Sequence, residues 1–188
     1  AWLERLVALE SEITYKTPPA PGERYFRYQP GRLPILLSAP HGAAHVREGR
    51  LKDEEDYTAA LARLVAELSG AHALYTCRLA DPDPGFYPET PYKRALRQIV
   101  RRHRIRFVVD LHGCAAYRDF GLALGTLHGQ SCPAERRRIL ARQRPGQALG
   151  GLAQQGVAVV VTEHVVGGGE LVHIDDRQGS AGPTGAQA

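Results

Sequence analysis

RLPILLSAPHG, at residues 32–42, decides the fold, because it contains a short apolar run that ends in a histidine followed by a glycine. A run that is apolar at successive positions predicts a strand buried on both faces, as in parallel sheets covered by helices. A second stretch of this kind, IRFVVDLHG at residues 105–113, also ends in His-Gly. The two stretches therefore predict buried, parallel strands in an α/β domain.

Helical and extended patterns alternate along the rest of the chain. The clearest predicted helix covers residues 53–68, where acidic residues open the segment and leucines follow at helical spacing. Other helices are predicted at residues 2–13, 92–103 and 134–149, and other strands at residues 25–28, 71–77, 121–127, 157–162 and 171–174. We therefore expect one domain over residues 1–188, a three-layer sandwich with helices on both faces of a mostly parallel sheet, and a loop-like tail at residues 178–188.

The composition is that of an ordinary globular protein. The chain has 188 residues, of which 43% are hydrophobic and 23% are charged. No apolar stretch is long enough to predict a membrane span. The three cysteines form no Cys-x-x-Cys pair, which favours a reducing compartment, and we expect a cytoplasmic protein. The net charge of +4 fits an anionic partner but does not favour nucleic acid, and the oligomeric state is not predicted.

Two histidines follow predicted strands directly. His41 and His112 each stand at the end of an apolar run and before a glycine. Ligands of open α/β sheets bind beyond the carboxyl ends of the strands, so neighbouring strands would bring both imidazoles to one crevice. We predict imidazole nitrogens within roughly 3–4 Å of each other, as two ligands of one zinc ion would be. The alternative is that each histidine is simply a packed or solvent-facing residue.

A third metal ligand is expected from the acidic run at residues 53–56. A catalytic zinc needs about three protein ligands, and a helix that starts after a strand lies at the same edge of the sheet. We predict Glu55 or Asp56 as this ligand, with Glu54 also open. The other interpretation is that the run only stabilises a helix N-terminus. Asp110, two residues before His112 on the same side of its strand, could orient an imidazole or polarise a water.

These motifs together resemble the N-formylglutamate amidohydrolase family. They are LSAPHG at residues 37–42, the acidic run, and VVDLHG at residues 108–113, and the similarity extends over about residues 32–175. The resemblance implies a fold similar to that of zinc carboxypeptidases and aspartoacylases, and one bound zinc ion. It also implies that His41 and His112 bind the metal together with Glu55 or Asp56.

The sequence departs from the family pattern in two places. Arg78 and the segment at residues 81–83 resemble an Arg followed by Asp-x-Asn-Arg, but Asp83 stands where Asn is usual and the second Arg is missing. The family also has a strand with Gln-x-Glu, whose Glu is a plausible general base, and this sequence ends about where that strand should begin. The sequence is then truncated, or another acid such as Glu163 serves, or the protein does not catalyse.

The resemblance implies an amidohydrolase that cleaves a small acidic amide, such as an N-formyl or N-acyl amino acid, with a zinc-activated water. Glu163 and Asp110 are the expected catalytic carboxylates. The residues expected to hold the substrate are Arg47, Arg78, Arg94 and His128.

The alternative function is that of a non-catalytic α/β protein that binds an anionic partner through basic helices. The basic clusters in question lie at residues 101–106 and 136–138. Such clusters are also typical of solvated helix faces, and no nucleic-acid-binding module accompanies them.

Overall fold

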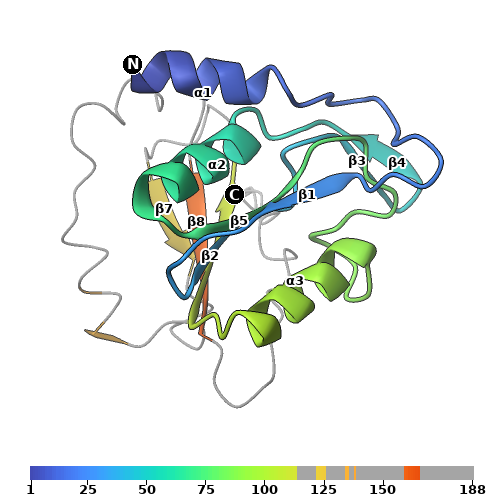
Figure 1. Ribbon diagram of the computed structural model, residues 1–188. Coiled ribbons are helices and arrows are strands. Elements are labelled where there is room, and N and C mark those ends of the chain that lie inside the picture. The colour runs from blue at the N-terminus through green and yellow to red at the C-terminus, as the bar shows by residue number, and fades with distance from the viewer. Residues whose placement is uncertain (114–121, 126–133, 136–137, 139–158, 166–188) are drawn as a thin grey trace, which may run out of the picture.

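A six-stranded mixed sheet forms the middle of the molecule (Figure 1). The computed structural model describes residues 1–113, 122–125, 134–135, 138 and 159–165. The sheet order is β1-β5-β2-β6-β8-β7. The strands are β1 Phe26–Gln29, β2 Ile35–Ala39, β5 His72–Thr76, β6 Phe107–His112, β7 Leu122–Gly125 and β8 Val159–Val165. β5, β2 and β6 are parallel neighbours, and so are β7 and β8, whereas β1 and β8 run antiparallel to β5 and β6 respectively.

Helices cover both faces of this sheet, as Figure 1 shows. α1 (Trp2–Glu10) and α2 (Thr58–Ser69) lie on one face, and α3 (Pro91–Arg102) lies on the other. The predicted α/β class, with a mostly parallel sheet between helices, is confirmed.

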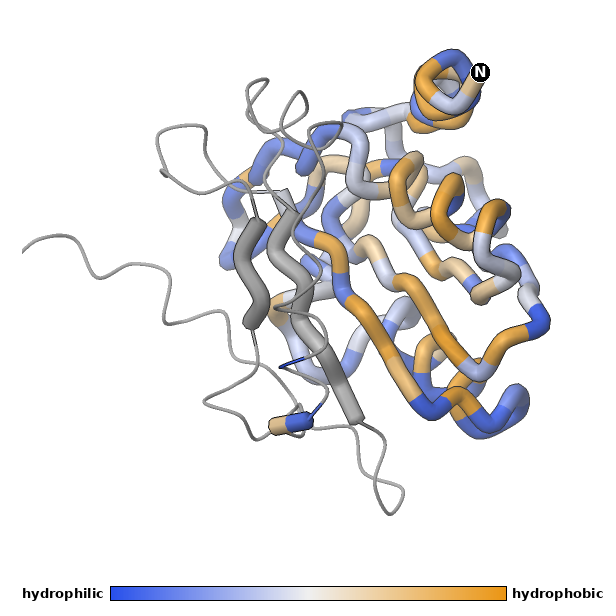
Figure 2. The backbone as a smooth tube through the Cα atoms, turned by 90° about the vertical axis from the view of Figure 1, so that its left-hand side faces the viewer, coloured by the Kyte–Doolittle hydropathy of each residue, from blue (hydrophilic) through white to orange (hydrophobic). Residues whose placement is uncertain are grey.

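β2 shows why an apolar run forms a central strand here. Successive side chains of a strand point to opposite faces, so Leu36 packs on the α3 side and Leu37 on the α2 side. Leu36 is fully buried against Leu74 and Val108 of the neighbouring strands. The orange strands in Figure 2 show this apolar layer running through the molecule. Burial on both faces fixes the carboxyl end of β2, where His41 follows.

The acidic run lies before α2 and not within it, so the predicted helix start at residue 53 is wrong. α2 begins at Thr58, and Tyr57 has a left-handed backbone with φ of 63°. A helix cannot continue backwards through a residue in this conformation, so residues 53–56 form a loop.

A second, two-stranded sheet was not predicted. It consists of β3 (His45–Arg47) and β4 (Arg50–Lys52), joined by a tight turn in which Glu48 and Gly49 both have positive φ. Several sequence predictions lie wholly or largely outside the described residues: the helix at residues 134–149, the strand at residues 171–174 and the tail at residues 178–188. Within the described part of the chain, no helix is both long and apolar enough to cross a membrane.

His72 makes the stability of the fold depend on pH. Its Nδ1 lies 2.6 Å from the Tyr28 hydroxyl and accepts a hydrogen bond from the Gly31 amide at 3.1 Å. Burial, together with the charge of His103, lowers the pKa of His72. Because the folded state disfavours the protonated ring, this stability is present above the unfolded pKa of about 6.5 and is lost as pH falls below it.

We therefore expect the wild-type protein to lose stability relative to His72→Phe as the pH falls from 7.5 to 5.5. Urea unfolding of both proteins across this range measures the difference. Free energies of unfolding that change equally with pH in the two proteins would contradict the lowered pKa of His72.

Candidate metal centre

The predicted meeting of the two strand ends is confirmed. β2 and β6 are adjacent and parallel, with Ser38 opposite Asp110 in the ladder. His112 is the last residue of β6, and His41 comes two residues after β2 ends. Their rings lie 5.0 Å apart between centroids, at an angle of 61°. Both imidazoles therefore stand at one edge of the sheet.

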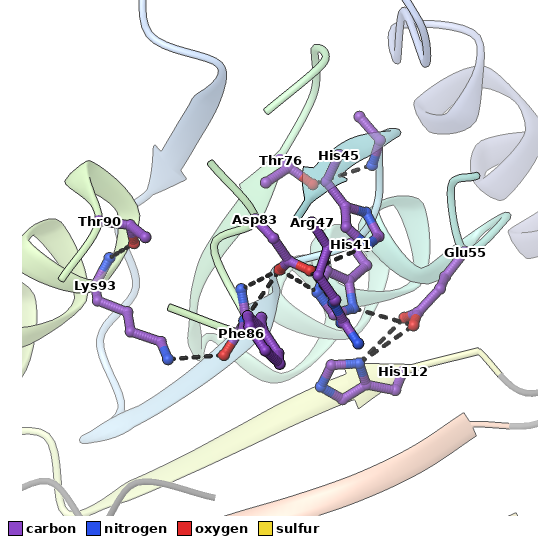
Figure 3. Close-up of polar contacts among 12 residues, drawn as sticks. His41, His45, Arg47, Glu55, Thr76, Asp83, Phe86, Thr90, Lys93 and His112 are labelled. Atoms are coloured by element: carbon purple, nitrogen blue, oxygen red, sulfur yellow. Dashed lines mark hydrogen bonds and ion pairs between the residues drawn. The ribbon is translucent and has the colours of Figure 1, made fainter. Parts of the chain in front are cut away.

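The carboxylate of Glu55 reaches both imidazoles from one side, as Figure 3 shows. Its Oε1 is 3.1 Å from His41 Nδ1, and its Oε2 is 3.2 Å from His112 Nδ1. The loop that carries Glu55 is tied to the first strand end, because its amide donates to the His41 carbonyl at 2.8 Å. The amide of Gly113 also donates to Oε2, at 3.0 Å. The structure thus brings Glu55, and not its exposed neighbour Asp56, to the histidines.

The contact with Asp83 favours one tautomer of His41. This fully buried carboxylate lies 2.9 Å from His41 Nε2. An imidazole that donates Nε2–H to Asp83 keeps only a lone pair on Nδ1 when it is neutral. Nδ1 and the Glu55 carboxylate are then two acceptors facing each other, which is stable only with a proton or a cation between them.

The pKa shifts show the same demand for positive charge. Burial alone would lower the pKa of His41 and His112 and raise that of Glu55. The opposite charges outweigh burial, so the pKa of each imidazole is raised and that of Glu55 is lowered. A metal ion bound there would meet the same demand and would displace protons from the imidazoles, so metal binding should release protons.

The spacing of the three groups fits a zinc ion. Two ligands that are each about 2.0–2.1 Å from a tetrahedral zinc stand roughly 3.4 Å apart. The distances from Glu55 oxygens to the two Nδ1 atoms are 3.1 to 3.4 Å, and the three ligand atoms lie within 4.8 Å of one another. Two imidazoles with one carboxylate form a donor set that zinc takes in catalytic sites.

His41 also belongs to a second group of potential metal ligands. His41, His45 and Asp83 also lie close together, and the rings of the two histidines stack at 4.2 Å. However, Arg47 Nε lies 2.7 Å from Asp83 Oδ2, so a guanidinium already neutralises this carboxylate. All three members of the group are buried, which leaves little access for substrate or water. We therefore favour the group of His41, Glu55 and His112 as the metal centre.

Asp83 instead stands where the outer partner of the candidate ligand His41 would be. Metal-binding histidines usually donate their other N–H to a carboxylate or carbonyl, which fixes the ring. Asp83 is itself held by the amides of Gly85 and Phe86, which donate to Oδ1 at 2.8 and 3.0 Å. A side chain at position 85 would collide with His41, since an added Cβ would lie 2.5 Å from Nε2. Glycine at this position therefore permits the close approach.

The predicted substrate-binding residues are dispersed. Arg47 lies at the site: it contacts Asp83, and its guanidinium stands 4.8 Å over the Phe86 ring. Arg78 lies elsewhere, paired with Glu23 at 3.4 Å. Arg94 is on the exposed side of α3. His128 lies outside the described residues.

The two predicted catalytic carboxylates occupy different places. Asp110 is half-buried two residues before His112, and its charge contributes to the raised pKa of that imidazole. Glu163 lies on β8 with its Cα opposite Val109, in the body of the sheet, whereas Val160 is opposite His112. Of these two, the structure places Asp110 beside a predicted metal ligand.

Sequence reasoning treated Asp83 only as a departure from a family pattern and missed its contact with His41. A signal was present, because Asp-Pro-Gly is typical of a turn in which the carboxylate accepts backbone amides. Such a turn predicts a fixed carboxylate, but it does not identify the histidine that the carboxylate meets. No protein-family model, curated protein or solved structure matches the chain.

The two overlapping groups can be separated by zinc titration. Wild-type protein should bind one equivalent of zinc. His112→Ala and Glu55→Gln should lower the affinity by more than the roughly 10–100-fold that loss of an outer partner costs. Asp56→Asn, a matched change in the neighbouring acid, should have no effect, and His45→Ala should keep the site. Loss of binding in His45→Ala but not in His112→Ala would place the metal in the other group.

Proposed function

We propose that the protein is a zinc-dependent hydrolase that cleaves a small amide, such as an N-formyl or N-acyl amino acid. One observation carries the proposal: two Nδ1 atoms converge on one carboxylate at zinc-ligand spacing at the carboxyl ends of parallel strands. Catalytic zinc sites with three protein ligands leave a position open for water or substrate. The resemblance to N-formylglutamate amidohydrolases suggests the same chemistry.

A zinc ion bound by His41, Glu55 and His112 would supply a Lewis acid that polarises a carbonyl and lowers the pKa of water. The surrounding residues keep this constellation fixed. Asp83 holds the ring of His41 through Nε2, and the amide of Gly113 holds the Glu55 carboxylate. Ligands held in this way pay little reorganisation cost during the reaction.

Amide hydrolysis also needs a group that takes a proton from water and returns it to the leaving amine. In our proposal Asp110 is that group, because it is a carboxylate on the same side of β6 as His112 and two residues away. Glu163 is the other candidate named by the sequence. A pH profile of Asp110→Asn that loses its acidic limb would distinguish the two.

The substrate in this proposal carries an acidic group. Arg47 stands at the site with 24% of its side chain exposed, and the Phe86 ring and Asp83 fix its orientation. A guanidinium held in this way can bind a carboxylate through paired hydrogen bonds. An N-acyl amino acid has such a carboxylate close to its scissile amide.

The alternative proposal, a binding protein for an anionic partner, has weaker support. Arg101 and Arg102 are exposed at the end of α3, where basic residues also interact favourably with the helix dipole. Arg136 and Arg137 lie outside the described residues.

The proposed activity is tested with a panel of N-formyl and N-acetyl amino acids. We expect hydrolysis that a chelator abolishes and zinc restores. His112→Ala should lower kcat/KM by about a hundredfold or more, because a Lewis acid contributes several kcal/mol to catalysis. His103→Asn, a change of a histidine outside the site, should keep the activity. A zinc-loaded protein with no activity on the panel, but with salt-sensitive binding to polyanions, would favour the alternative.

A further inference from the structure

Glu10, at the end of α1, is a buried carboxylate that helix packing does not explain. It is 8% exposed, and its Oε1 accepts hydrogen bonds from the Tyr57 amide at 2.8 Å and from the Tyr15 hydroxyl. Burial raises the pKa of Glu10, against the effect of the backbone amides of Tyr57 and Ala60. Burying a carboxyl group costs free energy, so this arrangement needs a reason.

α1 is already held on α2 by other contacts. Leu6 and Leu9 of α1 pack against Ala60 and Leu64 of α2. Three polar ties add to this packing: Arg5 with Glu67, Arg63 with the Leu9 carbonyl, and Arg63 with Glu12. The contact of Glu10 differs from these three, because its partner is the Tyr57 amide in the segment just before α2.

That backbone belongs to the loop of the candidate metal ligand. The backbone amide of Glu55 donates a hydrogen bond to the His41 carbonyl. The Glu55 carbonyl accepts hydrogen bonds from the amide and hydroxyl of Thr58. Tyr57 lies between Glu55 and α2 with a left-handed φ of 63°, which is unfavourable for a side chain of this kind. The Tyr57 amide donates its hydrogen bond to Glu10, so this carboxylate ties the backbone at the start of α2 to the end of α1.

We propose that Glu10 is a positioning residue for the metal centre: its carboxylate holds Tyr57 in the left-handed conformation and thereby keeps Glu55 within reach of both imidazoles. This role rests on the proposed function, because it presumes that Glu55 binds metal. Without the acceptor, Tyr57 relaxes, the loop shifts, and the metal loses its carboxylate ligand while the histidines stay in place.

Full-length Glu10→Met and Glu12→Met provide a matched pair of variants. Each replaces an acid near the end of α1 with an apolar side chain of similar length and removes one tie to the α2 region. Zinc affinity is measured by competition with a chromophoric chelator, and the unfolding midpoint is measured by urea. We expect Glu10→Met to lower the zinc affinity about tenfold or more, as loss of an outer-shell partner does. Glu12→Met should lower the urea midpoint and leave the zinc affinity unchanged.

Glu10→Gln should restore the affinity, because its amide oxygen still accepts from the Tyr57 amide, and it is the variant to use if Glu10→Met fails to fold. Equal affinity in Glu10→Met and Glu12→Met would overturn the positioning role, as would a Glu10→Gln protein that folds but binds zinc as weakly as Glu10→Met. A wild-type protein that binds no zinc would instead remove the metal site itself, and the role with it.

Discussion

The imidazoles of His41 and His112 both present Nδ1 to the carboxylate of Glu55, and this electrostatic constraint governs the edge of the sheet. Because His41 donates Nε2–H to Asp83, its neutral ring has a lone pair on Nδ1, only 3.1 Å from Glu55. His112 Nδ1 lies 3.2 Å from the same carboxylate. Nitrogen and oxygen atoms this close are stable only with a proton or a metal ion between them. The proposed metal centre follows from this requirement and does not depend on any single motif.

The fold supplies the rigidity that this constraint needs. β2 and β6 are buried between helices on both faces, so their carboxyl ends cannot move independently. The loop of Glu55 is secured from two sides, by the His41 carbonyl and by Glu10 of α1. The turn of Asp83 meets His41 from a third direction, with Gly85 giving the necessary clearance. Each side chain of the centre thus comes from a different element, which the sheet edge brings together.

The sequence predicted the parts of the site that depend on local pattern. An apolar run followed by His-Gly is enough to place a buried strand and a histidine at its end, and two such runs predicted that His41 and His112 meet. The choice of Glu55 over Asp56 could not be made, because it depends on the path of a loop that enters α2 through the left-handed Tyr57. Nothing in the local pattern distinguishes that residue from the first turn of a helix, which is why the helix start was predicted too early.

The contacts between distant segments could not be predicted for a different reason. Asp83 meets His41 across 42 residues of sequence, and Glu10 meets Tyr57 across 47. Turn chemistry in the first case, and helix amphipathicity in the second, predict only the local conformation. The partner of each carboxylate is set by how the helices and loops pack on the sheet.

A crystal structure of the protein grown with zinc, with anomalous scattering measured at the zinc edge, is the most direct test of the proposed metal centre. We predict one strong peak bonded to His41 Nδ1, His112 Nδ1 and the Glu55 carboxylate, at distances of about 2.0–2.2 Å. A peak between His41 Nε2, His45 and Asp83, or no peak at this edge of the sheet, would contradict the proposed metal centre.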